Sequence, residues 1–300
     1  MQLWNRYFLA SSVDETLELL LQYDGQARII AGGTDLLIEM REGHRPPQPV
    51  LVDITAIPAL TTIEQDNDQI ILGACVTHAR ITHSTALQKR ATCLVESCGV
   101  VGGPQVRNVG TIGGNVAHAL PAGDGTTSLV ALDAEAEVVI DGERHWRPIL
   151  ELFQGPGVSL LDSTRDLLVR FRFQAHQPHE GSAFDRIMRP QGVALPILGC
   201  AVWVRLNADN SHYEAARICI APVGPTPRRI TAVENMLAGC PATEDTLEAA
   251  VALAQEVIKP RTSKYRATAP YRSEMVAVLL RRALPAAVER AKTTMPVTSQ

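Results

Sequence analysis

The fold is decided by Ala31-Gly32-Gly33-Thr34-Asp35 and Thr111-Ile112-Gly113-Gly114-Asn115, two glycine pairs that each stand at the mouth of a predicted strand. Glycine has no Cβ atom, so a backbone at such a position can lie flush against a phosphate and direct its N–H groups toward it. Two loops of this kind predict a clamp on the pyrophosphate of a dinucleotide.

The residues around the first loop predict a strand, a glycine turn and a helix in succession. Residues 27–31 form a short apolar strand, and residues 36–40 restart as a helix with Thr34 or Asp35 as its cap. A proline cluster follows, and then a second strand over residues 50–54.

Beyond residue 57 the pattern changes to short strands and turns, with strands predicted at 70–72, 137–140 and 167–173. Residues 99–114 hold six glycines, and each glycine costs about 1 kcal/mol in a helix or strand. We therefore expect something other than ordinary core packing to order this tract. The polar stretch His176–Gly181 is predicted to be a linker between domains.

The last third of the chain predicts a smaller α+β domain. Two sheet strands are expected over residues 200–206 and 213–221. Three helices should follow, over residues 229–237, 244–258 and 274–290, and residues 291–300 are predicted to be a disordered tail.

The composition excludes several classes of protein. Lys and Arg total 28 against 32 Asp and Glu, a net charge of -4, so a nucleic-acid partner is not expected. No stretch is long and apolar enough to predict a membrane span or a signal peptide, and the six cysteines form no Cys-x-x-Cys pair. We expect a soluble, cytoplasmic protein with reduced, mostly buried thiols and no metal site.

The glycine pairs do not belong to the common nucleotide-binding motifs. The sequence contains neither Gly-x-Gly-x-x-Gly nor Gly-x-x-x-x-Gly-Lys-Ser/Thr. Thr34 and Thr111 can donate hydroxyls to phosphate oxygens, and Asn115 supplies an amide for a ring edge or a ribose. Asp124 either accepts from ribose hydroxyls or is a solvated turn residue.

Five motifs in this order resemble the FAD-binding (medium) subunit of the xanthine dehydrogenase, or molybdenum hydroxylase, family. The resemblance runs from about Trp4 to Val288. Besides the two glycine loops, it rests on Gly102-Gly103-Pro104-Gln105-Val106-Arg107-Asn108, Phe153-x-Gly155-Pro156-Gly157 and Ala221-Pro222-Val223-Gly224-Pro225-Thr226-Pro227.

The resemblance implies an α+β fold. It consists of a two-subdomain FAD-binding domain of the vanillyl-alcohol oxidase (PCMH) type over residues 1–176, divided at about residue 56. A smaller α+β domain like that of the carbon monoxide dehydrogenase flavoprotein follows over residues 177–290.

The resemblance also implies which residues hold FAD. The pyrophosphate would be gripped by both loops, namely by Ile29, Ile30, Ala31, Gly32, Gly33, Thr34, Asp35 and Leu36 and by Thr111, Gly114 and Asn115. Asp124 would stand on the adenosine side. Arg186 occupies a position where relatives usually carry Lys near the flavin, and it keeps the charge with a different donor geometry.

The implied function is electron transfer within a heteromeric molybdenum hydroxylase. This chain would carry FAD and pass electrons from the 2Fe-2S centres of a small iron–sulfur subunit to NAD or another acceptor. The molybdopterin would belong to a large partner subunit, and the lack of cluster-binding cysteine motifs agrees with clusters on a separate chain. Two alternatives stay open: a self-contained flavin oxidase or reductase of the same fold, and an assembly module without flavin.

Overall fold

The computed structural model describes residues 2–189, 195–264 and 266–294, which form two compact units that interleave along the sequence. The first unit comprises residues 1–80, 104–120 and 134–173, and the second comprises residues 81–103, 121–133 and 174–300. Residues 295–300 of the predicted tail lie outside the described residues, and the helix before them continues to Thr293.

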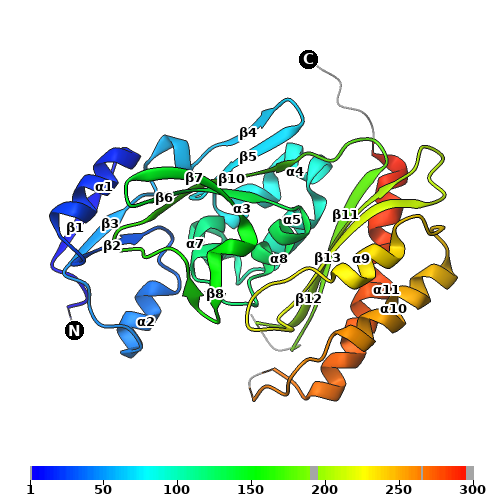
Figure 1. Cartoon of the computed structure of the whole chain (residues 1–300). Coiled ribbons are helices and arrows are strands. Elements are labelled where there is room, and N and C mark those ends of the chain that lie inside the picture. Colours follow the sequence, from blue (N-terminus) through cyan, green and yellow to red (C-terminus); the bar gives the residue numbers. More distant parts are fainter. Residues whose placement is uncertain (1, 190–194, 265, 295–300) are drawn as a thin grey trace. The chain divides into compact units, whose positions relative to one another are not determined.

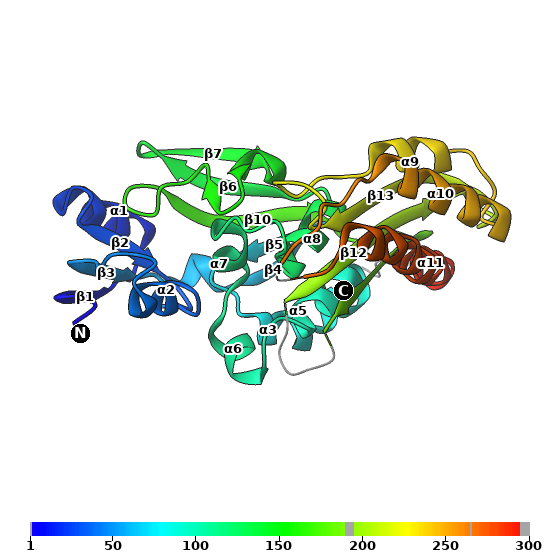
Figure 2. The ribbon, with the colours of Figure 1, turned by 90° about the horizontal axis from the view of Figure 1, so that it is seen from below.

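The first unit begins with a three-stranded parallel sheet in the order β1-β3-β2, formed by β1 (Arg6–Leu9), β2 (Ala27–Ile30) and β3 (Val50–Asp53). Figure 2 shows the connecting helices α1 (Val13–Gln22) and α2 (Leu36–Glu42) on opposite faces of this sheet. The strands at 27–31 and 50–54 and the helix at 36–40 were predicted, and the structure confirms them. The carboxyl ends of β2 and β3 therefore open onto the same edge.

The rest of the first unit is built on a five-stranded sheet in the order β4-β5-β10-β6-β7. Its strands are β4 (Ile63–Asp66), β5 (Gln69–Gly73), β10 (Leu167–Gln174), β6 (Glu135–Ile140) and β7 (Glu143–Pro148). Short elements complete the unit: η1 (Pro58–Leu60), α6 (Pro104–Val109), α7 (Ile112–Ala117), η2 (Ile149–Leu152), β8 (Phe153–Gly155) and β9 (Val158–Ser159). A buried cluster that includes Val52 of β3 and Val169 of β10 joins the two sheets.

The second unit is an antiparallel sheet of β11 (Glu180–Met188), β12 (Pro196–Leu206) and β13 (Tyr213–Ala221), in that order. Its helices are α4 (Thr85–Arg90), α5 (Thr92–Gly99), α8 (Asp124–Ala131), α9 (Thr231–Leu237), α10 (Glu244–Val257) and α11 (Ala269–Thr293), while α3 (His78–His83) crosses the boundary between the units. The stretch His176–Gly181, predicted to be a linker, leads directly into β11, and His176 and Glu180 are buried. The last boundary between the two units falls just before this stretch, after residue 173, and its role as a linker stays a prediction.

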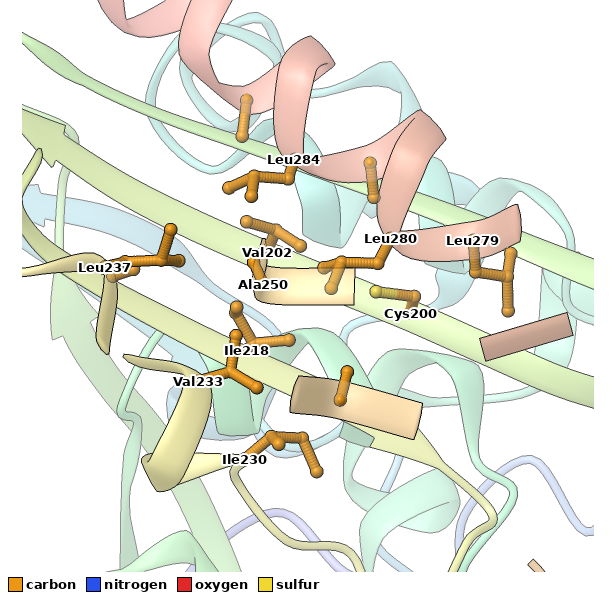
Figure 3. Packing of buried hydrophobic residues seen from close by; sticks show 14 of the residues in the cluster. Cys200, Val202, Ile218, Ile230, Val233, Leu237, Ala250, Leu279, Leu280 and Leu284 are labelled. Atoms are coloured by element: carbon orange, nitrogen blue, oxygen red, sulfur yellow. The ribbon is translucent and has the colours of Figure 1, made fainter. Parts of the chain in front are cut away.

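The core of the second unit lies between this sheet and the three C-terminal helices (Figure 1). In Figure 3, Leu280 and Leu284 of α11 point toward Cys200 and Val202 of β12, and all four are fully buried. Each such leucine contributes about 1.5–3 kcal/mol through burial. At Gly181 the backbones touch, because a Cβ there would lie 2.3 Å from the Ala287 carbonyl oxygen of α11.

Candidate functional site

The first glycine loop connects β2 to α2 in the first unit. Gly33 has a left-handed φ of +65°, which glycine adopts without strain. A Cβ at Gly32 would lie 2.2 Å from the Val109 carbonyl oxygen. Only glycine fits at this position, because another segment of the chain approaches it closely. The first loop therefore packs directly against the segment that leads into the second.

The backbone N–H groups of the first loop are available to a ligand. Among the described residues, none accepts a hydrogen bond from the N–H of Gly32, Gly33 or Thr34. The Thr34 hydroxyl lies 3.3 Å from a carboxylate oxygen of Asp35, and the Asp35 side chain does not cap α2. Ile29 and Leu36, at the two ends of the predicted set, are half-buried, and the Ile29 N–H is already donated to the Ser163 carbonyl at 2.9 Å.

The amides of the second loop are, by contrast, used within the chain. The Gly113 N–H donates to the Ala74 carbonyl at 2.8 Å, and the Gly114 N–H donates to the Thr111 hydroxyl at 3.0 Å. The Asn115 N–H donates to the Thr111 carbonyl, also at 3.0 Å. Among the described residues, the N–H groups of Gly113, Gly114 and Asn115 thus have partners within the chain, whereas those of Gly32, Gly33 and Thr34 have none.

The two glycines of the second loop have different reasons to be glycine. A Cβ at Gly113 would lie 2.6 Å from both the Cβ and the carbonyl oxygen of Ala74, so the packing of Ala74 leaves no space for a side chain at this position. Gly114 is exposed, and a Cβ there would meet within 4 Å only the Thr111 hydroxyl, at 3.1 Å. Gly114 is thus the member of the pair whose bare surface faces outward.

Both loops border one cavity of about 410 Å³ in the first unit. It lies where β2 and β3 end, and an antiparallel bridge between Thr77 and Thr111 forms part of its wall. Most of its residues belong to no recognisable sequence motif, although Asp53 at the carboxyl end of a predicted strand offers a signal. The lining consists of Ala31, Gly32, Asp53, Thr55, Thr61, Cys75, Thr77, Arg80, Asn108, Val109 and Thr111.

Asp124 and Arg186 belong to the second unit, where they bind each other. An Arg186 Nη1 donates to an Asp124 carboxylate oxygen at 2.6 Å, and both side chains are less than 10 % exposed. Burial raises the pKa of Asp124 to about 6, although the charge and hydrogen bond of Arg186 and the charge of Arg266 oppose the shift. Among the described residues, the other carboxylate oxygen, Oδ1, has no hydrogen-bond partner.

The six cysteines carry free thiols, and five of them are buried, as predicted. Burial raises the pKa of Cys75, the thiol that lines the cavity, to about 12. In residues 2–189, 195–264 and 266–294, no three His, Cys, Asp or Glu side chains are grouped to hold a metal ion. None of the helices in the same ranges has the length and hydropathy needed to cross a bilayer.

Two family models match the chain in succession. The first, described as the FAD binding domain in molybdopterin dehydrogenase, matches residues 3–173. The second, the C-terminal domain of the CO dehydrogenase flavoprotein, matches residues 182–287.

Individual proteins match over nearly the whole length. The carbon monoxide dehydrogenase medium chain of Hydrogenophaga pseudoflava is 32% identical over 95% of this chain and 97% of its own. The xanthine dehydrogenase FAD-binding subunit of Escherichia coli O157:H7 is 28% identical over 95% and 96%, respectively. A solved structure of the Hydrogenophaga pseudoflava carbon monoxide dehydrogenase superposes with a TM-score of 0.88 at 30% identity, covering 97% of this chain and 99% of that one.

Proposed function

We propose the function of this chain on the basis of its family, because the chain belongs to the FAD-binding medium subunits of the xanthine dehydrogenase, or molybdenum hydroxylase, family. The predicted family and fold class are thereby confirmed, and the chain is an oxidoreductase subunit with FAD as its cofactor. We infer that it passes electrons from 2Fe-2S centres of a partner subunit to NAD or another acceptor. The observation that carries this proposal is the end-to-end match to flavoprotein subunits, over both of the family's domains.

The first glycine loop fits the pyrophosphate of FAD. Three successive residues, Gly32, Gly33 and Thr34, present N–H groups that no described residue uses, and such groups suit phosphate oxygens. Gly114 adds a surface without a Cβ, so that a phosphate can approach the backbone. We propose that Ile29–Leu36, Thr111, Gly114 and Asn115 hold this part of the coenzyme.

The chemistry of electron transfer comes from the coenzyme: FAD, when bound, accepts electrons singly and delivers them in pairs. The contribution of this chain is to hold FAD and to shape its surroundings. Asp124 and Arg186 provide a buried ion pair, and we propose that Arg186 contacts the coenzyme.

Relatives support a role inside a larger complex. One is named as a medium chain, another as a FAD-binding subunit, and a third, 32% identical, as subunit alpha of the 6-hydroxypseudooxynicotine dehydrogenase complex of Paenarthrobacter nicotinovorans. We propose that this chain assembles with a small iron–sulfur subunit and a large molybdopterin subunit in the cytoplasm.

The test is to purify this chain alone and together with its partner subunits, and to follow the flavin absorbance. We expect yellow protein in both preparations, with the flavin reduced by organic substrate only in the complex and reoxidised by NAD or another acceptor. Direct reduction of the isolated chain by a small substrate would instead indicate a self-contained flavin enzyme. Colourless protein that takes up no FAD would indicate an assembly module.

A further inference from the structure

A dense group of positive charges lies at the junction between α10 and α11 of the second unit. Residues 259–273 contain five lysines and arginines and neither aspartate nor glutamate, although the whole chain has a net charge of -4. Four of the five lie farther than 4.0 Å from every carboxylate of the described residues, namely Lys259, Arg261, Arg266 and Arg272. Like charges repel one another, so a partner of opposite charge would be favoured here.

The connection between the two helices, which can be followed in Figure 1, is fixed by hydrogen bonds. Helix α10 ends at Val257 and α11 begins at Ala269, and the described residues between them form neither helix nor strand. The Ser263 N–H donates to the Ala267 carbonyl at 3.0 Å, and the Ala269 N–H donates to the Thr262 hydroxyl at 3.0 Å. The connection is longer than the usual length of about four to six residues, and ordered connections of this kind commonly serve in binding.

Arg272, in the first turn of α11, holds this connection in place from inside the unit. Its side chain is buried, and its guanidinium donates to the carbonyls of Arg261, at 2.5 Å, and of Pro222. Burial lowers the pKa of Arg272, and the charges of Arg266 and Arg261 lower it further. The backbone at Arg261 is thus fixed, while its side chain is exposed.

Two exposed apolar side chains belong to the same junction. Val257, the last residue of α10, is 39% exposed, and Tyr271 of α11 is 44% exposed. The Gln255 side chain donates to the Ser273 carbonyl at 3.3 Å, so the end of α10 stays close to the start of α11. Arginine and tyrosine are enriched where protein surfaces bind each other. The junction therefore combines uncompensated charge with the side chains typical of a protein interface.

We propose that Lys259, Arg261, Val257 and Tyr271, which we call the basic surface, dock an acidic surface of the small iron–sulfur subunit. The proposal rests on the proposed function and names a contact within it. Electrons pass from the 2Fe-2S centres to FAD only while the subunit that carries these centres is bound to this chain. The two cations steer the encounter, and Tyr271 becomes buried in the contact.

The test measures by titration calorimetry how tightly the full-length flavoprotein binds the purified small subunit, at low and at high salt. We expect Lys259→Glu and Arg261→Glu each to weaken binding about tenfold at low salt, and less at high salt, because salt screens exposed charges. Tyr271→Ala should weaken binding about tenfold at both salt concentrations, because it removes apolar contact area.

The matched control is Lys89→Glu, the same substitution as Lys259→Glu at an exposed lysine in the last turn of α4, in the same unit. It should bind the small subunit as the wild type does. The side chains of Lys259 and Arg261 are exposed, so these variants should keep the wild-type flavin content and urea unfolding, which confirms that they fold.

Unchanged binding in both Lys259→Glu and Arg261→Glu, or an equal loss in Lys89→Glu, would overturn the proposal. It would also be overturned if these changes weakened binding to the large subunit and left binding to the small subunit intact. Wild-type protein that binds neither partner subunit would instead refute the proposed function itself.

Discussion

At the scale of single residues, substitutions of the two glycines of the second loop are expected to have opposite effects on stability and on FAD binding. Gly113→Ala places a methyl group 2.6 Å from Ala74, so we expect the free energy of unfolding to fall by about 1–3 kcal/mol, with or without FAD. Gly114→Val places its side chain on the exposed surface, so the protein should fold but lose bound FAD. Urea unfolding and the ratio of flavin to protein absorbance distinguish the two effects.

The pair serves as its own control, because both changes lie in the same short helix. If Gly114→Val retained its full FAD content, our placement of the phosphate would be wrong. If Gly113→Ala unfolded like the wild type, the close approach to Ala74 would not be a packing constraint.

A second prediction at this scale concerns the pH dependence of stability. Burial raises the pKa of Asp124 from 3.8 to about 6 in the folded protein, so the folded state holds this proton more tightly than the unfolded state. The stability that this group contributes is therefore lost as the pH rises through this window. A shift of this size corresponds to about 3 kcal/mol.

Asp124→Asn removes the titration while it keeps the shape of the side chain. We expect the unfolding free energy of the flavin-free wild type, measured relative to this variant, to fall by up to about 3 kcal/mol between about pH 4 and pH 7. Urea titrations across that range provide the measurement. A difference that stayed constant with pH would show that Asp124 does not titrate there.

At the scale of elements, the sheet of the second unit is covered by helices from two distant parts of the chain. Helices α9, α10 and α11 pack on one face, while α5 and α8 contact the strands as well (Figure 1). The carboxylate of Glu96 in α5 accepts from the Phe184 N–H at 2.8 Å and from Arg290 at 2.9 Å. The sheet thus depends on residues that precede it by about ninety positions in the sequence.

We therefore expect a fragment of residues 174–300 to lose its fixed tertiary packing. Without α5 and α8, buried side chains such as Ala201 and Cys219 lose their cover, and Arg290 loses its carboxylate partner. Near-ultraviolet circular dichroism and urea unfolding, compared with the full-length protein, provide the measurement. A sharp unfolding transition equal to that of the full chain would contradict this view of the unit.

At the scale of the whole molecule, the features that could be predicted from the sequence are those that depend on residues close to one another along the chain. The strand, glycine turn and helix at residues 27–40 follow from local pattern, and the family follows from ordered motifs. The residue-level FAD contacts and the division at residues 176 and 177 stay predictions.

Contacts between distant residues could not be predicted in the same way. The amide of Gly113 is satisfied by Ala74, and the space beside Gly32 is filled by Val109, so both glycine requirements come from segments far away in the sequence. The burial of His176 and Glu180 could not be predicted for a similar reason, because it depends on elements that local pattern does not reveal.

The interleaving of the two units has a consequence for synthesis on the ribosome. The chain passes from one unit to the other after residues 80, 103, 120, 133 and 173. The helices α5 and α8 therefore leave the exit tunnel before any strand of their sheet has been translated. Their apolar faces must wait for more than fifty further residues, and during that interval a chaperone has the greatest opportunity to bind this polypeptide.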